Sequence, residues 1–355
     1  MAYPTTYSAW RRSGLRGTKE APLTIHRTDE ALPSSLGPND VVIKIHAVAL
    51  NYRELAMLNG TYPADFQDKG IPCSDAAAEV IATGSSVSRF KTGDRVTANC
   101  CIGKTYEGGD DGVSVGVGTT APGVLREYAV FNEEHLVKIP KHLSWEEAST
   151  LACAGVTAWN ALDGLREVPE GAYALLQGTG GVSMFALILC LSTGLRPIIT
   201  SSSDEKLATI KKLDPSIQGL NYKSVSDQGA EIQRLTNGRG VHFVVNNSGP
   251  GSLMDDIGFL AERGGTVSIV GFLAGFDGKW APRDIMRLMS KSAKLKGIAM
   301  GTRKDFEDMN RYLEEKEVHL DALLVDRPFA FADAKAAYDR LESGKFHGKI
   351  VIKME

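Results

Sequence analysis

The chain lacks the features that would attach it to a membrane or to nucleic acid. It has 355 residues, yet no apolar run approaches the roughly 20 residues that a membrane-spanning helix needs. Its formal net charge is only −3 and contains no block of like charge, which argues against nucleic acid or an anionic membrane as a partner. Its first residues lack the apolar centre of a secretory signal. We therefore expect a small-molecule ligand, with no nucleic acid and no membrane as partner.

Cysteine is also scarce. The five cysteines are an odd number and do not follow the spacing of a disulfide framework, so we expect reduced thiols and a cytoplasmic protein. Hydrophobic residues make up 43% and charged residues 23%, which is an ordinary globular composition. The length is sufficient for two domains that each bury a core.

Short β-runs broken by Gly, Pro and Asp fill the first part of the chain. The clearest are residues 41–50, 77–84, 94–100 and 125–130. Their spacing predicts a compact, mostly antiparallel β domain. Residues 103–123 are glycine-rich and too long for an ordinary connection, which predicts a functional or mobile surface loop.

From about residue 145 to 300, apolar strands alternate with helical patterns. Residues 144–162 predict a helix that opens with Ser144 as N-cap and Glu147 completing a capping box. Apolar strands separated by helices predict a parallel sheet covered on both faces. A last helix, a glycine turn and a strand over 331–354 could extend either domain.

One turn carries the pattern of a phosphate-binding loop. Residues 178–183 (GTGGVS) follow the apolar strand 172–177 directly and open a helix. Glycines allow the tight turn and the close approach of backbone to a pyrophosphate, and the free N–H groups of the helix N-terminus receive the anion. The third position of this fingerprint is Ser183 rather than glycine. The context still predicts a dinucleotide site.

The end of the next strand bears on which dinucleotide binds. An acid expected there would bind a free ribose 2′-hydroxyl, but the strand ends in residues 200–203 (TSSS), and Asp204 and Glu205 come only afterwards. Hydroxyls together with Lys206 suit a 2′-phosphate. The same segment also reads as a helix-capping turn. The chemistry favours NADPH over NADH.

These residues together resemble the medium-chain dehydrogenase/reductase superfamily along nearly the whole chain, and most closely its zinc-independent, quinone-oxidoreductase-like branch. The matching stretches are residues 51–63, 93–96, 151–162, 175–186, 201–207, 221–223 and 344–352. The resemblance implies an α/β fold with a GroES-like, mostly β substrate domain and a Rossmann cofactor domain with a doubly wound parallel sheet. It assigns residues 1–135 and 312–355 to the first and 136–311 to the second. It also implies an active site in the cleft between them, and a homodimer.

The resemblance also implies roles for individual residues. The expected cofactor contacts are Thr157, Gly178, Gly180, Gly181, Val182, Ser202, Lys206, Tyr222, Asn246, Gly271, Phe272 and Leu273. Asn51 would line the nicotinamide side of the cleft. Tyr52 next to it could donate a proton or a hydrogen bond, although a residue that only packs on the cofactor would fit the same position. Asp75 and Arg53 are weaker candidates for the proton donor.

The zinc ligands of the superfamily's alcohol dehydrogenases are missing. Alignment puts Asn51 at the first ligand and Ser74 and Asp75 at the His-Glu pair, so that only Cys153 survives. A catalytic zinc needs three protein ligands, and no ladder of paired cysteines provides a structural zinc site. We therefore expect no metal.

Without a Lewis acid, an activated acceptor becomes the more suitable substrate, because hydrogen bonds can hold the enolate or hydroquinone anion that forms. We expect NADPH-dependent reduction of an enone, an enoyl thioester or a quinone. A zinc-free alcohol dehydrogenase or carbonyl reductase is the first alternative. A catalytically lapsed, NADPH-binding scaffold is an alternative of another class.

Overall fold

The computed structural model describes residues 3–102, 115–166, 168–324 and 327–354, and the chain divides into two compact units. The first unit combines Met1–Val156 with Gly301–Glu355, and the second is Thr157–Met300. Residues 103–114 of the predicted glycine-rich loop lie outside the described residues. Within those residues, no helix combines the length and the apolar character needed to cross a membrane.

The boundaries differ from the predicted 135 and 312, because the flanking segments pair and pack with the β unit. Strand β9 (Leu136–Lys138) pairs antiparallel with β5 (Arg95–Ala98). Helix α9 (Arg303–Glu315) packs on β9, and the Asn310 side chain donates a hydrogen bond to the Lys138 carbonyl at 2.7 Å. Both segments therefore belong to the first unit.

The first unit is mostly antiparallel β-structure, as the sequence predicts. Its central sheet has the order β16-β17-β3-β4-β5-β9, with β8 also paired to β3. Only β16 and β17 run parallel among these pairs. Besides β5 and β9, the strands are β1 (Thr6–Arg12), β2 (Ile25–Ala31), β3 (Asp40–Ala49), β4 (Asp75–Thr83), β6 (Cys101–Ile102), β7 (Val115–Gly116), β8 (Tyr128–Asn132), β16 (Phe329–Ala330) and β17 (Val351–Lys353). Besides α9, the helices are α1 (Tyr52–Leu58), α2 (Trp145–Ala148) and α10 (Ala334–Ser343).

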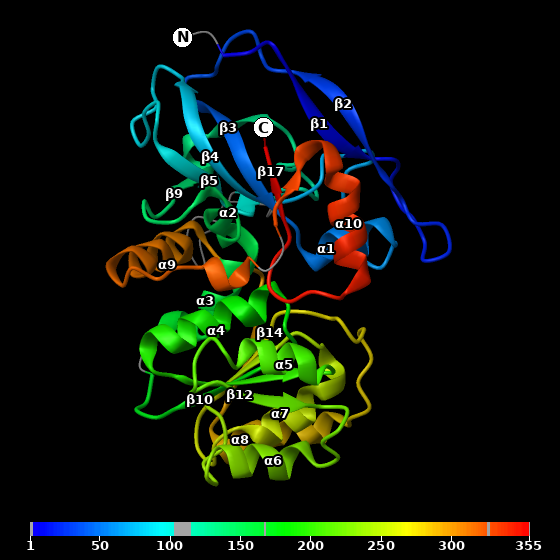
Figure 1. Cartoon of the computed structure of the whole chain (residues 1–355), viewed down its shortest axis with the longest axis vertical. Coiled ribbons are helices and arrows are strands. Elements are labelled where there is room, and N and C mark those ends of the chain that lie inside the picture. The colour runs from blue at the N-terminus through cyan, green and yellow to red at the C-terminus, as the bar shows by residue number, and fades with distance from the viewer. Residues whose placement is uncertain (1–2, 103–114, 167, 325–326, 355) are drawn as a thin grey trace. The chain divides into compact units, whose positions relative to one another are not determined.

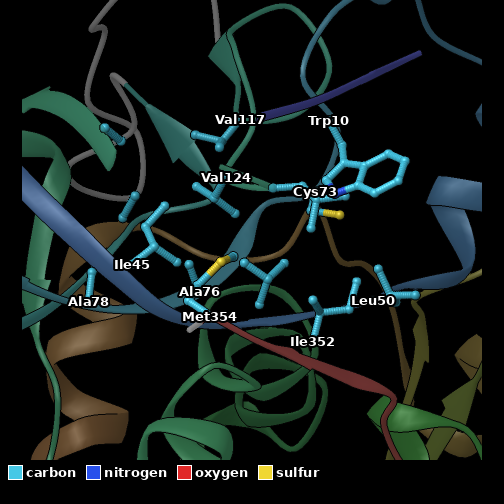
Figure 2. Close-up of a cluster of buried hydrophobic side chains, with 14 of the residues drawn as sticks. Trp10, Ile45, Leu50, Cys73, Ala76, Ala78, Val117, Val124, Ile352 and Met354 are labelled. Carbon is cyan, nitrogen blue, oxygen red and sulfur yellow. The ribbon is translucent and has the colours of Figure 1, made fainter. Parts of the chain in front are cut away.

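The core of this unit joins parts of the chain that lie far apart in the sequence. Figure 2 shows Ile45 of β3, Ala76 of β4 and Ile352 of β17 with their side chains in one apolar cluster. Trp10 closes the cluster, and its indole N–H donates to the Phe331 carbonyl at 3.0 Å. The last strand, β17, thus pairs with β3 and is also contacted by helix α10.

The second unit is built on a six-stranded, wholly parallel sheet of order β12-β11-β10-β13-β14-β15. In chain order this is 3-2-1-4-5-6, the order of the doubly wound dinucleotide-binding fold, so that fold prediction is confirmed. The strands are β10 (Tyr173–Leu176), β11 (Arg196–Ser201), β12 (Gln218–Asn221), β13 (Phe243–Asn246), β14 (Thr266–Ile269) and β15 (Lys294–Gly297). The chain's direction of winding reverses between β10 and β13.

Helices cover both faces of this sheet, which its apolar strands require. Within this unit, Figure 1 shows α4 and α5 on one side of the strands and α6, α7 and α8 on the other. The helices are α3 (Val156–Ala161), α4 (Gly181–Thr193), α5 (Asp204–Ile210), α6 (Gln228–Leu235), α7 (Leu253–Phe259) and α8 (Arg287–Lys291). Gly194 ends α4 in the left-handed conformation at φ 77°, which glycine adopts without strain.

The predicted single helix over 144–162 is wrong in one respect. Its start is confirmed, since Ser144 caps α2 and Glu147 completes the capping box. A π-helical turn then occupies Leu151–Gly155, before α3 begins. One extra residue in the turn shifts the side chains that follow, and such turns are frequent at functional sites.

Candidate functional site

The turn after β10 leaves the space that a pyrophosphate needs. Gly178 has φ +79°, a conformation that glycine adopts without strain. A Cβ added at Gly178 or at Gly180 would meet no protein atom within 4 Å, so the space beside the backbone is open. Gly180 is the N-cap of α4 and offers no side-chain cap, so the first N–H groups of Gly181 and Val182 remain for an anion. These residues fit a dinucleotide.

Ser183 explains why the third fingerprint position is not glycine. Its side chain is buried and donates to the Gln177 carbonyl at 2.7 Å. The Asn247 amide donates to both Ser183 Oγ, at 3.0 Å, and the Gln177 carbonyl, at 3.1 Å. The serine therefore ties the turn to the segment after β13, at the point where strand order reverses.

The candidate 2′-phosphate residues lie at two neighbouring strand ends. Ser201 of β11 and Asn221 of β12 are partners in the sheet, so Ser202 and Tyr222 follow adjacent strands. Ser202 is exposed, Tyr222 is 45% exposed, and Lys206 is half-buried in the first turn of α5. The strand end itself carries no carboxylate, which leaves this edge suited to a phosphate.

The side chain of Asn246 is enclosed by the protein and hydrogen-bonded within it. Its side chain is fully buried and accepts from Gly249 N at 2.8 Å. It donates to Asp256 Oδ2 at 2.6 Å, and also to Ser252 Oγ. Its contact with a nicotinamide ribose stays a prediction.

Asp256 was not predicted from the sequence. Its carboxylate accepts hydrogen bonds from side chains at the ends of two neighbouring strands, β10 and β13. Besides Asn246 and Ser252, Gln177 Nε2 donates to its Oδ1 at 2.7 Å. Burial raises the pKa of Asp256 to about 7 despite these three donors. It sits in the interior of an ordinary helix, where no sequence pattern distinguishes it.

The residues predicted for the carboxamide follow β14. A Cβ at Gly271 would lie 2.8 Å from the Asn247 carbonyl oxygen, so glycine is required there. Leu273 N donates to the same oxygen at 3.0 Å, and the rings of Phe272 and Phe276 stack with centroids 5.0 Å apart. The backbone here is thus fixed against the loop after β13. Thr157, at the other end of the unit's chain, is buried in α3.

In the first unit, three strands bring the aligned zinc-ligand positions together around a lysine. Val351 of β17 pairs with Ala49 of β3, and Ala49 pairs with Asp75 of β4. This register puts Lys349 opposite Asn51, just beyond the ends of β17 and β3. Lys349 Nζ donates to Asn51 Oδ1 at 2.7 Å and to Asp75 Oδ2 at 3.2 Å.

The ion pair between Lys349 and Asp75 is almost completely buried, with the side chains 2% and 0% exposed. Ser74 Oγ donates to the other oxygen of Asp75 at 3.1 Å. The amide nitrogen of Asn51 is buried as well and has no hydrogen-bond partner. Lys349 was not predicted as a site residue, although it lies in the stretch 344–352 that resembles the superfamily.

Cys153 lies close enough to Asp75 to interact with it electrostatically, but its thiol is already hydrogen-bonded and is not available as a zinc ligand. Its thiol shares a hydrogen bond with Cys100, which lowers the pKa of Cys100 and, together with burial, raises the pKa of Cys153. The Arg53 guanidinium contacts Cys100 Sγ at 3.6 Å and also donates to the Val117 carbonyl. Arg53 is therefore held by the β unit.

These donors do not fit a catalytic zinc. Within the described residues, no group of three or more His, Cys, Asp or Glu side chains is placed to hold a metal ion. An ammonium lies between two of the aligned ligand positions, and a cation beside it would be repelled. Tyr52 is the first residue of α1 and is 45% exposed, so it is accessible to a ligand.

Comparison with known proteins matches two domain families in this chain. Residues 37–141 match the alcohol dehydrogenase GroES-like domain, and residues 181–315 match the family described as zinc-binding dehydrogenase. A zinc-type alcohol dehydrogenase-like protein of Schizosaccharomyces pombe is 37% identical over 330 residues, which cover 91% of this chain and 93% of that one.

Solved structures with a similar fold match nearly the whole length of this chain. A putative alcohol dehydrogenase from Sinorhizobium meliloti 1021 superposes with a TM-score of 0.85 at 30% identity, and the match covers 99% of this chain and 100% of that chain. A quinone oxidoreductase of Pseudomonas syringae has a TM-score of 0.75 at 25% identity, covering 98% and 99%.

Proposed function

The chain belongs to the medium-chain dehydrogenase/reductase superfamily and is an oxidoreductase of that type, and from this premise we propose that it transfers hydride from NADPH to an activated double bond or a quinone without zinc. The observation that carries the proposal is the buried Lys349–Asp75 ion pair at the aligned zinc-ligand positions. Its ammonium is a fixed hydrogen-bond donor beside the positions where the metal enzymes of the superfamily bind zinc.

The proposed cofactor contacts divide into three groups. The backbone of Gly178, Gly180, Gly181 and Val182 would hold the pyrophosphate, since the space beside this turn is open. Ser202, Lys206 and Tyr222 would bind the 2′-phosphate, as charge-assisted hydrogen bonds favour that group over a bare hydroxyl. Thr157, Asn246 and the 271–273 backbone would contact the nicotinamide half. When bound, the reduced nicotinamide supplies the hydride.

An activated acceptor suits a site of hydrogen-bond donors. Hydride addition to an enone or a quinone moves negative charge onto an oxygen, and preorganised donors stabilise that charge. The exposed phenol of Tyr52 is the proposed proton donor or hydrogen-bond donor. Its position at the start of α1, next to Asn51, supports this role.

Reduction of an unactivated carbonyl is the second candidate, because two of the relatives are described as alcohol dehydrogenases or as like them. An aldehyde or ketone also places its developing charge on oxygen. It would need a stronger acid than an enone does, since the product alkoxide is more basic than an enolate. A lapsed scaffold would bind NADPH but transfer its hydride to none of the acceptors offered.

One experiment separates these functions. The purified protein is mixed with NADPH and a panel of enones, quinones, aldehydes and ketones, and the absorbance of NADPH is followed. We expect turnover with enones or quinones and much slower turnover with simple carbonyls. Turnover restricted to aldehydes or ketones would favour the alternative chemistry, and tight NADPH binding with no turnover at all would leave only the scaffold.

We also propose a cytoplasmic homodimer. Strand β15 is an edge of the parallel sheet, and the nearby Met286 and Met289 are 54% and 72% exposed. An open strand edge beside exposed apolar side chains is suited to pairing with a second copy of the chain. Sedimentation equilibrium tests this: a monomer at micromolar concentration would contradict it.

A further inference from the structure

The buried Lys349 retains a hydrogen-bonding capacity that the protein does not use. An ammonium has three N–H donors, and two of them go to Asn51 Oδ1 and Asp75 Oδ2. No other acceptor for its side chain exists among the described residues. The third N–H is therefore left for a ligand.

The lysine also determines which way the Asn51 amide faces. Because an ammonium can only donate, it takes the amide oxygen as its acceptor, so Nδ2 makes no hydrogen bond to the lysine. That Nδ2 is buried and without a partner. Buried amide donors are almost always satisfied in native proteins, so an unsatisfied one needs an explanation such as a missing ligand.

Asp75 makes the arrangement rigid and compensates the buried positive charge of Lys349. It pairs with Lys349, is itself held by Ser74, and is completely buried. Without such a partner, a buried ammonium would carry a large desolvation penalty. The glycine before the lysine, Gly348, has φ +73°, so the backbone turn that brings Lys349 to this point depends on glycine.

We propose that Lys349 Nζ and Asn51 Nδ2 together form an oxyanion site that binds the carbonyl oxygen of the substrate. This inference rests on the proposed function. The charge of Lys349 replaces the metal cation that the zinc enzymes of the superfamily use, and the disagreement between this chain and a zinc site follows from that replacement.

Reduction of an enone consists of hydride addition followed by protonation. The β-carbon of the substrate accepts a hydride, with both electrons of the broken C–H bond of the dihydronicotinamide. The C=C π pair forms a new double bond to the carbonyl carbon, and the C=O π pair moves onto oxygen. Lys349 and Asn51 donate hydrogen bonds to this enolate oxygen, and a proton from solvent or Tyr52 then adds to the α-carbon.

The first test follows the reaction and the cofactor separately. We expect Lys349→Met to lower kcat with 2-cyclohexenone on the order of 10²–10³-fold, the usual effect of losing an oxyanion donor. NADPH affinity, measured by fluorescence titration, should stay unchanged. Lys345→Met is the matched control, since Lys345 is exposed in the same segment. A parallel loss of NADPH affinity would mean that Lys349 binds the cofactor, and would overturn the proposal.

The second test needs no turnover. 4-Nitrophenol is titrated in the presence of the protein, and its absorbance gives the fraction bound as phenolate. The wild-type site should lower the apparent pKa of the bound phenol, and Lys349→Met should abolish that shift. If the phenol is not bound, or its pKa is the same with both proteins, the oxyanion site is wrong. If wild-type protein reduces no enone yet lowers the phenol pKa, only the proposed function has failed.

A double variant guards against unfolding. Lys349→Met leaves Asp75 as an unpaired buried carboxylate, whereas Lys349→Met with Asp75→Asn removes both charges. We expect the double variant to unfold at nearly the wild-type temperature and still to lack the phenolate shift. A folded double variant that keeps the shift would overturn the proposal.

Discussion

At the scale of single residues, the proposed preference for NADPH rests on three side chains at the ends of β11 and β12. Ser202 and Tyr222 follow paired strand ends, and Lys206 lies one helical turn further along the chain. Ser201 and Ser203 are used locally: Ser201 Oγ accepts from Ser203 N at 3.1 Å, and Ser203 Oγ accepts from Lys206 N at 3.3 Å. The capping turn therefore uses Ser201 and Ser203, and it does not compete with the proposed phosphate contact of Ser202.

Lys206→Ala should weaken the binding of NADPH and leave that of NADH unchanged. A charge-assisted contact to a partly exposed phosphate is worth roughly 1–2 kcal/mol, or about 5- to 30-fold in the dissociation constant. Fluorescence titration with both cofactors measures this. Lys212→Ala, an exposed lysine just after the same helix, should change neither affinity. Equal losses for both cofactors would show that Lys206 does not read the 2′-phosphate.

At the scale of elements, the strand–turn–helix unit from β10 to α4 combines an open turn with a tied base. The open part comprises Gly178 and Gly180, where an added Cβ would meet no protein atom within 4 Å. The rigid base consists of Ser183, Gln177 and Asn247, which are linked by hydrogen bonds. A rigid base with an open rim is what backbone recognition of a pyrophosphate requires.

Gly180→Val should abolish cofactor binding while the protein stays folded. Gly180 has an ordinary φ of −79°, and its Cβ would enter open space, so the valine neither strains the backbone nor clashes within the protein. Its methyl groups would instead occupy the place of the pyrophosphate. Isothermal titration calorimetry measures binding and thermal unfolding measures the fold. Gly258→Val is the control, because a Cβ there also meets nothing and the residue lies on the exposed side of α7. Normal NADPH binding by Gly180→Val would show that the turn is misassigned.

Asp256 predicts how the second unit responds to pH. Its pKa is raised to about 7 in the folded chain, against about 4 when unfolded. Between these values the unfolded state releases the proton and the folded state keeps it, so folded stability falls as pH rises from about 4 to 7, by up to roughly 4 kcal/mol. Above pH 7 this loss is complete.

Urea unfolding at pH 4 to 8 tests that dependence. Asp256→Asn should remove this component, so that the difference in unfolding free energy between variant and wild type changes with pH over that range. Asp277→Asn, which changes an exposed acid of the same unit that is not among the groups shifting the Asp256 pKa, should run parallel to wild type. Parallel curves for Asp256→Asn and wild type would contradict the raised pKa.

The elements themselves were largely predictable because their signals are local. Apolar runs located β3, β4 and β10, and the cap at Ser144 located the start of one helix. The π-helical turn at Leu151–Gly155 was not predictable, since its residues have the same apolar pattern as an α-helix. Asp256 was missed because its importance comes from Gln177 and Asn246, which other strands supply.

At the scale of the whole molecule, the catalytic candidates depend on contacts between distant parts of the chain. Lys349 and Asn51 are 298 positions apart, and only the pairing of β17 with β3 brings them together. The sequence predicted the absence of zinc ligands, but not the cation found in their place. Hydrophobic patterning indicates that a strand exists, and it does not determine which partner the strand takes. The domain boundaries shifted for the same reason.

The last prediction concerns the metal content of the whole protein. We expect elemental analysis to find less than about 0.1 zinc per chain after growth in zinc-supplemented medium, and chelators to leave activity unchanged. The physical reason is that thiolate, imidazole and carboxylate ligands bind zinc, whereas this site presents an amide, a carboxylate already paired with Lys349, and a thiol hydrogen-bonded to the thiol of Cys100. A zinc alcohol dehydrogenase handled in parallel controls for metal lost during purification. Finding about one zinc per chain would revive Asp75 and Cys153 as ligands and would require Lys349 to move away from Asp75.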